Sequence, residues 1–284
     1  MQRFNDLRSK VRTAKSGTKM LFAVGGWENS QYFSSIAADP TKRANFVNHV
    51  ANFLRDQQID GVDVDWEYPV TGGATEGIPA DKRKQFLMTF SSIEDHSLMN
   101  LLENYVTLLS DLRTRLTNLA TELGRTVPYE ITLASAAGEW TIRPGYDLSG
   151  IMQYADFINV MTYDYYGAWG SQWGAYTGPP SPLFYGSPPG FSGKLNADFT
   201  MKYYSCRSGK PSKLNMGVPF YGRNLGGLMI WAIDLDDYSN TLLDVISSAD
   251  LCSGGSGDTS SYQCVPIDDI RWWTPENSGP DTQV

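Results

Sequence analysis

The chain has 284 residues, 41% hydrophobic and 19% charged, which is enough to bury a sizeable core; α/β barrels of this length usually form one domain. Its formal net charge of −8 argues against nucleic acid or an anionic membrane as a partner, because both would repel it. No segment reaches the roughly 20 consecutive apolar residues that a membrane-spanning helix needs.

The first part of the chain alternates short apolar runs with longer amphipathic ones. A helix-like pattern covers Gln2 to Lys15, and a strand is expected from Lys19 to Trp27. A helix is expected from Pro40 to Gln57, beginning near Thr41. This alternation is typical of βα units, which build parallel sheets.

The next expected strand, Gly61 to Trp66, leads into a row of acidic side chains. Asp63, Asp65 and Glu67 alternate with apolar residues, so the acids share one face of the strand at spacings of about 6–7 Å. Three acids in one apolar setting cannot all ionise cheaply, so at least one pKa should be raised toward neutrality. Glu67, at the end of the row, is the candidate proton donor.

Two other interpretations of this row stay open. An exposed strand face carries acids at no cost, and periodicity alone does not say whether the acidic face lines a cavity or meets water. An acid cluster can also hold a divalent metal through oxygen ligands. Against a metal, the segment has no spacing like that of a calcium loop, and the chain offers only His49 and His96 to a softer metal. We expect neither a metal nor a cofactor.

After the acidic row the alternation of expected strands and helices continues. A long helical stretch is expected to follow the loop Thr71 to Gly77 and to run through Arg125. Further elements are expected in chain order: strands at Glu130 to Ala137, Phe157 to Tyr163 and Lys213 to Tyr221, and a helix at Asn240 to Ala249. A Gly/Ser-rich linker and tail come next, so we divide the chain into a domain of residues 1–250 and a tail of residues 251–284.

The three cysteines, Cys206, Cys252 and Cys264, make an odd number, so at least one has no partner within the chain. Cys252 and Cys264 bracket a Gly/Ser-rich stretch that would close as a small disulfide loop in an oxidising compartment. Three free thiols are the alternative; we favour the loop.

The acidic row, Asp60-x-x-Asp63-x-Asp65-x-Glu67, resembles the signature of family 18 glycoside hydrolases, the chitinases and their relatives. Four other segments resemble strands of that family in chain order: Phe22–Trp27 the third, Met161–Asp164 the sixth, Met216–Arg223 the seventh and Gly227–Asp234 the eighth. The resemblance runs from about Phe4 to Asp237. It implies an α/β fold of the TIM (β/α)8-barrel type, with the active site at the C-terminal ends of the strands.

The resemblance implies endo-hydrolysis of β-1,4-linked N-acetylglucosamine polymers, so that chitin or chito-oligosaccharides would be the partner. Glu67 would protonate the glycosidic oxygen, and the 2-acetamido carbonyl of the sugar would attack the anomeric carbon, in a retaining reaction. Asp65 would hold the acetamido N–H, and Asp63 would share a proton or hydrogen bond with Asp65. The negative charge of these two would keep Glu67 protonated.

Further roles carry over from the family position by position. Tyr163 would donate a hydrogen bond to the acetamido oxygen, Asp164 would bind sugar hydroxyl or acetamido groups, and Trp231 would form the floor of the site. Further substrate contacts are assigned to Trp27, Tyr68, Met161, Tyr221 and Arg223, although barrel packing explains Met161 better. Three further tryptophans would either extend the substrate-binding cleft or only stabilise the loops in which they lie: Trp140, Trp169 and Trp173.

The sequence also departs from the family. Two strands that precede Gly25-Gly26 in the family have no counterpart, and three residues after Arg223 are too few for the crossover to the next parallel strand. A small α+β insertion domain found there in many members is also missing, and Lys84 to Glu103 looks like extra sequence. We therefore expect an incomplete barrel. An inactive chitin- or oligosaccharide-binding protein, or a fragment of a chitinase, is the alternative function.

The expected location follows from the resemblance alone. Family members are secreted, which implies an extracellular protein. The segment Met1 to Arg8 is charged and lacks the apolar core of a signal peptide, so we expect that the chain as written is not exported by the usual route.

Overall fold

The structure, a computed structural model, describes residues 2–13, 17–75, 77–78, 81, 104–166, 179–184, 193–219 and 229–231. The chain divides into two compact units. The first comprises residues 1–135 and 143–158, and the second comprises residues 136–142 and 159–284. The six strands, β1 to β6, are hydrogen-bonded in chain order.

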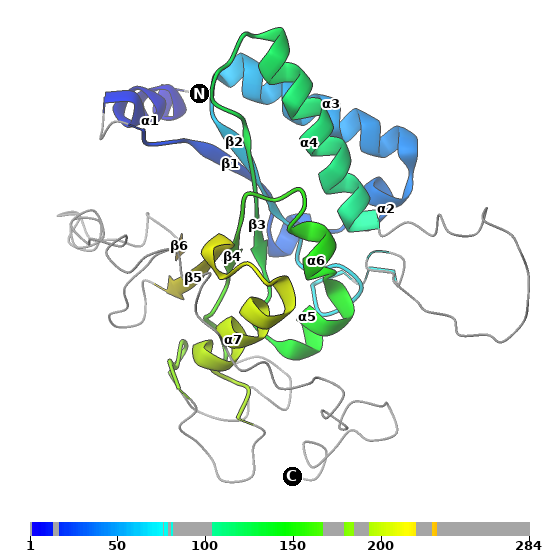
Figure 1. The fold of residues 1–284 in the computed structure, drawn as a ribbon, viewed down its shortest axis with the longest axis vertical. Helices are drawn as coiled ribbons and strands as arrows, with labels where there is room; N and C mark the ends of the chain where they lie inside the picture. Colours follow the sequence, from blue (N-terminus) through cyan, green and yellow to red (C-terminus); the bar gives the residue numbers. More distant parts are fainter. Residues whose placement is uncertain are drawn as a thin grey trace, which may run out of the picture. The chain divides into compact units, whose positions relative to one another are not determined.

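The first unit is built on three parallel strands, β1 (Leu21–Gly25), β2 (Gly61–Asp65) and β3 (Glu130–Ser135) (Figure 1). In their register Ala23 lies beside Asp63, and Asp63 lies beside Thr132. The next strand, β4 (Phe157–Val160), begins in this unit and ends in the second.

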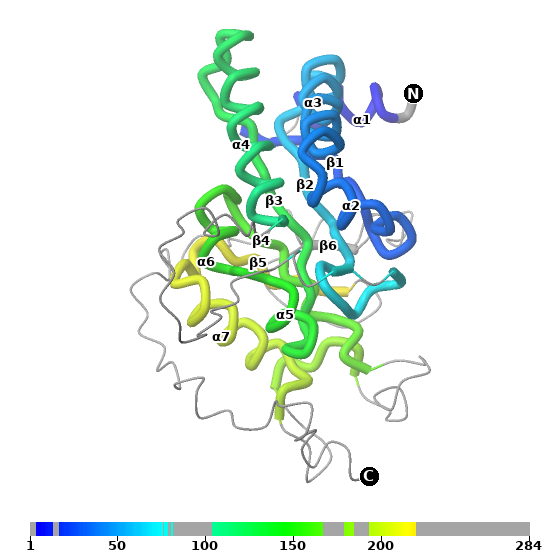
Figure 2. Tube along the Cα trace, turned by 90° about the vertical axis from the view of Figure 1, so that its right-hand side faces the viewer, coloured from blue at the N-terminus to red at the C-terminus, as the bar shows by residue number. Residues whose placement is uncertain are grey.

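Two long helices of this unit, α3 (Pro40–Gln57) and α4 (Asn104–Glu122), pack side by side (Figures 1 and 2). The side chain of Asp39 caps α3 by accepting the N–H groups of Thr41 and Lys42 at 2.8 and 3.0 Å, and Pro40 fits the first helical position. Five leucines are buried along α4, and beyond the adjacent first pair they are spaced three or four residues apart: Leu108, Leu109, Leu112, Leu116 and Leu119. This spacing gives α4 one apolar face, and burying that face stabilises the helix.

The apolar face of the acidic strand packs in the core. Val62 and Val64 are fully buried. Trp66, 2% exposed, stacks on Phe33 of α2 (Phe33–Ala38) with ring centroids 5.4 Å apart, and meets Tyr105 edge-on at 5.0 Å. Since side chains alternate along a strand, Asp63 and Asp65 project from the opposite face.

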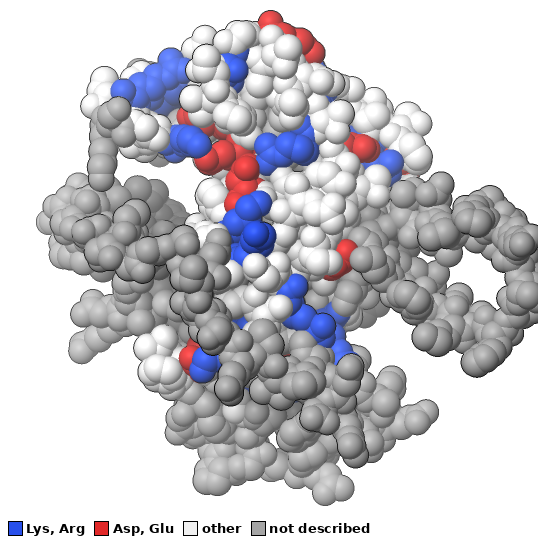
Figure 3. Space-filling model, viewed as in Figure 1, with Lys and Arg blue, Asp and Glu red and all other residues white. Residues whose placement is uncertain are grey.

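The N-terminal ends of these strands are held by ion pairs: Lys19 with Glu130, Arg125 with Asp60, and Arg113 with Asp156. Asp60 also has a backbone partner, because its second oxygen accepts the N–H of Met20 at 3.0 Å. Figure 3 shows acidic and basic side chains interleaved on the visible face of the molecule. Each carboxylate at this end of the strands therefore has a cation beside it.

The second unit contains β5 (Leu214–Pro219), β6 (Met229–Trp231) and α7 (Ala197–Ser208). Asn196 caps α7 by accepting the N–H of Phe199 at 2.9 Å, and Gly209, with φ 63°, ends the helix. The hydroxyl of Tyr204 donates to the carbonyl of Ala136 at 2.7 Å, which ties α7 to the segment that follows β3.

The remaining described elements are short except for the first: α1 (Gln2–Thr13), η1 (Trp27–Asn29), α5 (Glu139–Gly145), α6 (Leu148–Ile151) and η5 (Pro211–Lys213). None of the helices in the described ranges is long and apolar enough to cross a bilayer.

The expected elements occur where the apolar runs place them, but several ends differ. The first strand stops at Gly25 instead of Trp27, because Gly25 and Gly26 have φ 119° and 90°, which breaks the extended chain. The helix α4 ends before Arg125 because Gly124, with φ 61°, turns the chain. The helices α2, α5, α6 and α7 were not expected. The expected helix at Asn240 to Ala249 lies outside the described residues.

One topological expectation is wrong. The strands β5 and β6 are parallel neighbours, with Gly217 beside Met229 and Pro219 beside Trp231, although the connection was judged too short. In the part of the chain that the structure describes, three residue pairs of these two strands are in register.

The favoured cysteine pairing is wrong. Cys206, in α7, is disulfide-bonded. Because the chain has only three cysteines, this bond uses one of the other two, so Cys252 and Cys264 cannot also form the expected loop with each other. Those two cysteines lie outside the described residues.

The end of β1 approaches β2 so closely that only glycine fits. A Cβ atom on Gly25 would lie 2.0 Å from the backbone oxygen of Asp65 and 2.8 Å from the ring of Phe33. Gly124 provides a contrast, since its φ is also positive, at 61°, but a Cβ there would meet nothing within 4 Å.

We predict that Gly25→Ala lowers the free energy of unfolding by about 3 kcal/mol or more, because backbone strain and a clash with backbone atoms add. Gly124→Ala should cost only the strain, about 1–2 kcal/mol. Urea denaturation of the full chain measures both variants. Equal losses would show that β1 can move away from Asp65 at little cost.

Candidate active site

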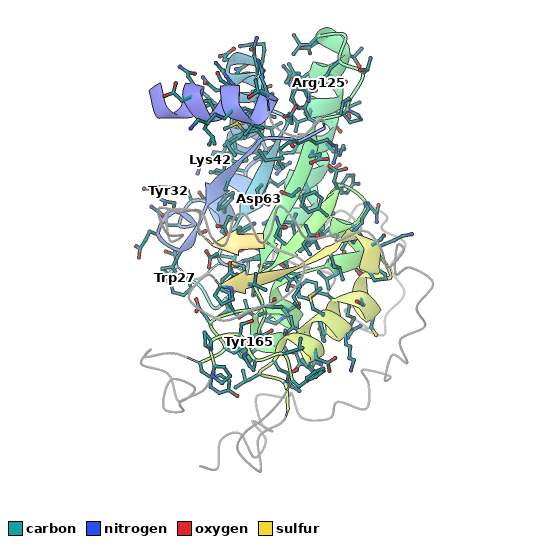
Figure 4. All side chains as sticks on the ribbon, turned by 90° about the vertical axis from the view of Figure 1, so that its left-hand side faces the viewer. Trp27, Tyr32, Lys42, Asp63, Arg125 and Tyr165 are labelled. Carbon is teal, nitrogen blue, oxygen red and sulfur yellow. The ribbon has the colours of Figure 1, made fainter. Side chains whose placement is uncertain are left out.

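The three acids lie at the C-terminal end of β2. Asp65 is 7% exposed, whereas Asp63 and Glu67 are half-buried. Figure 4 shows Arg125, Asp63 and Trp27 at successive levels along the strands, with Arg125 at the opposite end from Trp27. The acids are thus separated from the ion pairs at the N-terminal ends. Within the described ranges, no group of three His, Cys, Asp or Glu side chains is arranged to hold a metal ion.

Asp65 is the most perturbed member of the row. Burial, followed by the negative charges of Glu67 and Asp63, raises the pKa of Asp65 from 3.8 to about 7. Its Oδ1 atom is buried and has no hydrogen-bond partner among the described residues. The expectation that one acid of the row has a raised pKa is confirmed for Asp65. This carboxyl group can hold a proton near neutral pH, as proton-transfer chemistry requires.

Ser30, which the sequence analysis did not single out, hydrogen-bonds to backbone groups at the end of the acidic row and at the end of β1. The hydroxyl oxygen of Ser30 accepts the N–H of Glu67 at 2.8 Å, and the hydroxyl lies 2.9 Å from the carbonyl of Gly26 and 3.3 Å from that of Asp65. The N–H of Gly26 also donates to the carbonyl of Asp65 at 2.8 Å. Ser30 is 5% exposed, so it fixes Glu67 relative to the glycine pair from within the protein. A serine shortly after a strand carries no sequence signal for this role.

The sequence analysis also did not single out Thr132, although the sequence holds a feature that could have indicated it. Its hydroxyl donates a hydrogen bond to Oδ1 of Asp63, from the adjacent position on β3. A threonine between Ile131 and Leu133, in a strand whose side chains are otherwise mostly apolar, is the residue that could have been singled out.

The segment after Glu67 presents two aromatic rings. The ring of Tyr68, which follows a cis peptide bond from Glu67, lies edge-on to Trp27 with centroids 6.4 Å apart. Trp27 is 49% exposed. A Cβ on Gly73 would lie 2.0 Å from the carbonyl oxygen of Glu67, so the loop that follows folds back directly onto the acid's backbone.

Asp81 anchors this loop. It is fully buried and accepts the N–H of Ile78 at 2.7 Å, the hydroxyl of Ser34 at 3.0 Å and the side-chain amide of Asn104 at 3.5 Å. These partners come from the loop, α2 and α4, so one carboxylate connects three elements.

The sixth-strand residues lie in the second unit, which we describe by itself. Tyr163 is 9% exposed, Asp164 is exposed with φ 57°, and Met161 is half-buried. Between them, Thr162 is fully buried and donates a hydrogen bond to the carbonyl of Gly217. The segment is therefore fixed to β5 while Asp164 faces outward.

Nearby in this unit, a buried pair of hydroxyls joins α7 to the chain after Tyr163. Tyr165 donates to Thr200 at 2.7 Å, and Thr200 donates to the carbonyl of Ala137 at 2.9 Å. Burial raises the pKa of Tyr165, so the phenol stays neutral and acts as a structural donor.

Tyr221, Arg223, Trp169 and Trp173 lie outside the described residues. Trp231 belongs to β6, where the structure describes the backbone only. Trp140 is 40% exposed.

Comparisons with known proteins agree on one family. Residues 1–225 match the model of the glycosyl hydrolases family 18. Over 224 residues the chain is 34% identical to Chitinase A1 of Niallia circulans, an alignment that covers 77% of this chain and 28% of that protein. The chain therefore spans less than a third of that relative.

Two solved structures are similar over about three quarters of this chain and half of their own. An immunomodulatory active chitinase from Trichuris suis is 27% identical with a TM-score of 0.61, covering 76% of this chain and 50% of that one. The Ostrinia furnacalis Group IV chitinase in complex with allosamidin is 32% identical with a TM-score of 0.58, covering 77% and 50%. These similarities confirm the expected α/β fold of an incomplete TIM-type barrel, with six strands in the described part of the chain.

The perturbed carboxyl group makes stability depend on pH. The pKa of Asp65 is raised in the folded state, so its contribution to stability is present below the ordinary value of 3.8 and is lost as the pH rises through about 7. We predict that the free energy of unfolding falls by about 2–3 kcal/mol more between pH 5 and 8 in the wild type than in Asp65→Asn. Urea denaturation across this range measures the difference.

Asp39→Asn is the matched control. The N–H groups of Lys42 and Thr41 lower the pKa of Asp39, so it stays ionised across this range and the variant should keep the wild-type slope. A parallel slope for Asp65→Asn would contradict the raised pKa of Asp65.

Proposed function

The chain belongs to the glycosyl hydrolases of family 18, and from this premise we propose that it catalyses chitinase-like endo-hydrolysis of β-1,4-linked N-acetylglucosamine polymers. The observation that carries the proposal is the buried Asp65 carboxyl group, with a pKa raised to about 7, between Asp63 and Glu67 at the end of a strand. The chain spans 28% of Chitinase A1 and 34% of a probable chitinase of Drosophila melanogaster. The activity of the whole relatives is therefore a proposal for this chain.

The proposed reaction retains the configuration at the anomeric carbon and uses the substrate's own acetamido group. Glu67 donates its proton to the glycosidic oxygen as the bond to the anomeric carbon breaks, and the acetamido carbonyl oxygen forms the new bond to that carbon. Water then opens the intermediate, and Glu67 takes up the proton of that water. No carboxylate of the protein serves as the nucleophile.

Asp65 suits the role of acetamido partner because of its burial. A carboxyl group in an apolar setting strengthens any hydrogen bond that it makes to the acetamido N–H and orients the carbonyl oxygen toward the anomeric carbon. Its proton can be shared with Asp63 on the same strand face. Tyr163 is the proposed donor to the acetamido oxygen.

Sugar binding is assigned to the exposed aromatic groups. Trp27, exposed and in contact with Tyr68, the residue after Glu67, offers a ring face on which a pyranose can stack. Asp164, exposed in the second unit, is the proposed partner of sugar hydroxyls, together with Met161, Tyr221, Arg223 and Trp231. We place the protein outside the cell, where chitin is found.

We predict that Glu67→Gln lowers kcat on a fluorogenic chitobioside by at least about 100-fold, because it removes the general acid. Binding should change little, because glutamine keeps the shape of the side chain. Turnover assays and calorimetric titration with allosamidin, the ligand in the Ostrinia furnacalis structure, measure the two effects.

Glu122→Gln is the control, since this glutamate lies exposed on α4, and its activity should equal that of the wild type. Turnover that survives in Glu67→Gln would rule out the assignment of the acid. Binding of allosamidin without turnover in the wild type would favour the alternative, a chitin-binding protein that does not hydrolyse.

A further inference from the structure

The neighbours of Asp63 on the two adjacent strands differ in kind. On β3, Thr132 lies in register with Asp63, is 1% exposed, and donates its hydroxyl to Oδ1 of Asp63. On β1, the residue in register is Ala23, whose side chain has no polar atom. The polar support for Asp63 from the flanking strands of the first unit therefore comes from β3.

Asp65, two residues further along the same face, has no such donor. Its neighbour in register on β1 is Gly25, and its Oδ1 atom is buried without a partner among the described residues. An O–H donor stabilises negative charge on a carboxylate, and burial without a donor disfavours that charge. The two aspartates thus stand in opposite environments only two residues apart.

We propose that Thr132 is a positioning residue, whose hydroxyl fixes Asp63 and stabilises its charge so that the proton shared along the row stays on Asp65, where the acetamido group is held. This inference rests on the function proposed above. The titratable groups that flank Asp65 on β2 are Asp63 and Glu67, and the residues in register with these aspartates on β1 and β3, namely Ala23, Gly25 and Thr132, do not titrate in this range. The raised pKa of Asp65 agrees with this placement of the proton.

Thr132 can be tested with two substitutions that differ in one feature each. Thr132→Val replaces the hydroxyl by a methyl group of similar size in a buried strand position, so packing is largely kept while the donor is lost. Thr132→Ser keeps the donor and loses only the methyl group. A role that depends on the hydroxyl separates the two variants, whereas a packing role does not.

We expect Thr132→Val to lower kcat on the chitobioside by about tenfold, the effect of losing one hydrogen bond to a charged group, with KM within about twofold of the wild type. Thr132→Ser should keep most of kcat. Unchanged kcat in Thr132→Val, or equal losses in both variants, would overturn the proposal. If Thr132→Val fails to melt cooperatively, Thr132→Ala, which also lacks the hydroxyl, takes its place with the same expected loss.

A second readout needs no turnover. Carbon-detected NMR titration of aspartate side chains labelled with ¹³C should give a midpoint near 7 for Asp65 in the wild type. The midpoint should fall in Thr132→Val, because Asp63 then competes for the proton, and should stay unchanged in Thr132→Ser. An unchanged midpoint in Thr132→Val would overturn the proposal even in an active enzyme. A shifted midpoint in a chain without turnover would support the role of Thr132 and count against the proposed function instead.

Discussion

The candidate site depends on the close approach of β1 to the end of β2. Because Gly25 has no side chain, the backbone of β1 reaches the carbonyl of Asp65, and Gly26 and Ser30 can then hydrogen-bond to it. Ser30 in turn holds the N–H of Glu67. The position of Glu67 therefore follows from a backbone contact between β1 and β2. Any side chain at Gly25 would disturb this contact and, through it, the position of Glu67.

The carboxylates at the two ends of the strands lie in opposite electrostatic environments. At the N-terminal ends, Asp60 and Glu130 lie beside Arg125 and Lys19, so their charges are compensated. At the C-terminal end, Asp65 is buried beside like charges, and its Oδ1 atom has no hydrogen-bond partner among the residues that the structure describes. The ion pairs stabilise the fold, whereas the buried Asp65 lowers the free energy of unfolding near neutral pH. Such a cost is expected where carboxylates serve proton transfer, and parallel α/β barrels place their active sites at this end.

The sequence predicted the parts of the fold that depend on periodicity. The strand with Val62, Val64 and Trp66 on one face and the acids on the other was expected, and the buried Trp66 confirms it. What was missed depends on contacts between distant segments: the hydroxyl of Ser30 reaches residues 35 and 37 positions away, and that of Thr132 reaches a residue 69 positions away. The pairing of β5 with β6 was likewise not predicted, because the expectation rested on the length of the connection between them.

The position of the raised pKa changes how the acidic row is understood. Sequence reasoning placed the proton at Glu67, because it ends the row, whereas burial raises the pKa of Asp65 in its middle. The two assignments are compatible if they describe different protons, one on Glu67, the proposed general acid, and one shared between Asp63 and Asp65. In the proposed mechanism Asp63 is ionised and holds the shared proton on Asp65, so that Asp63 carries the negative charge of the pair. Each carboxyl group of the row would then set the charge that its neighbour experiences.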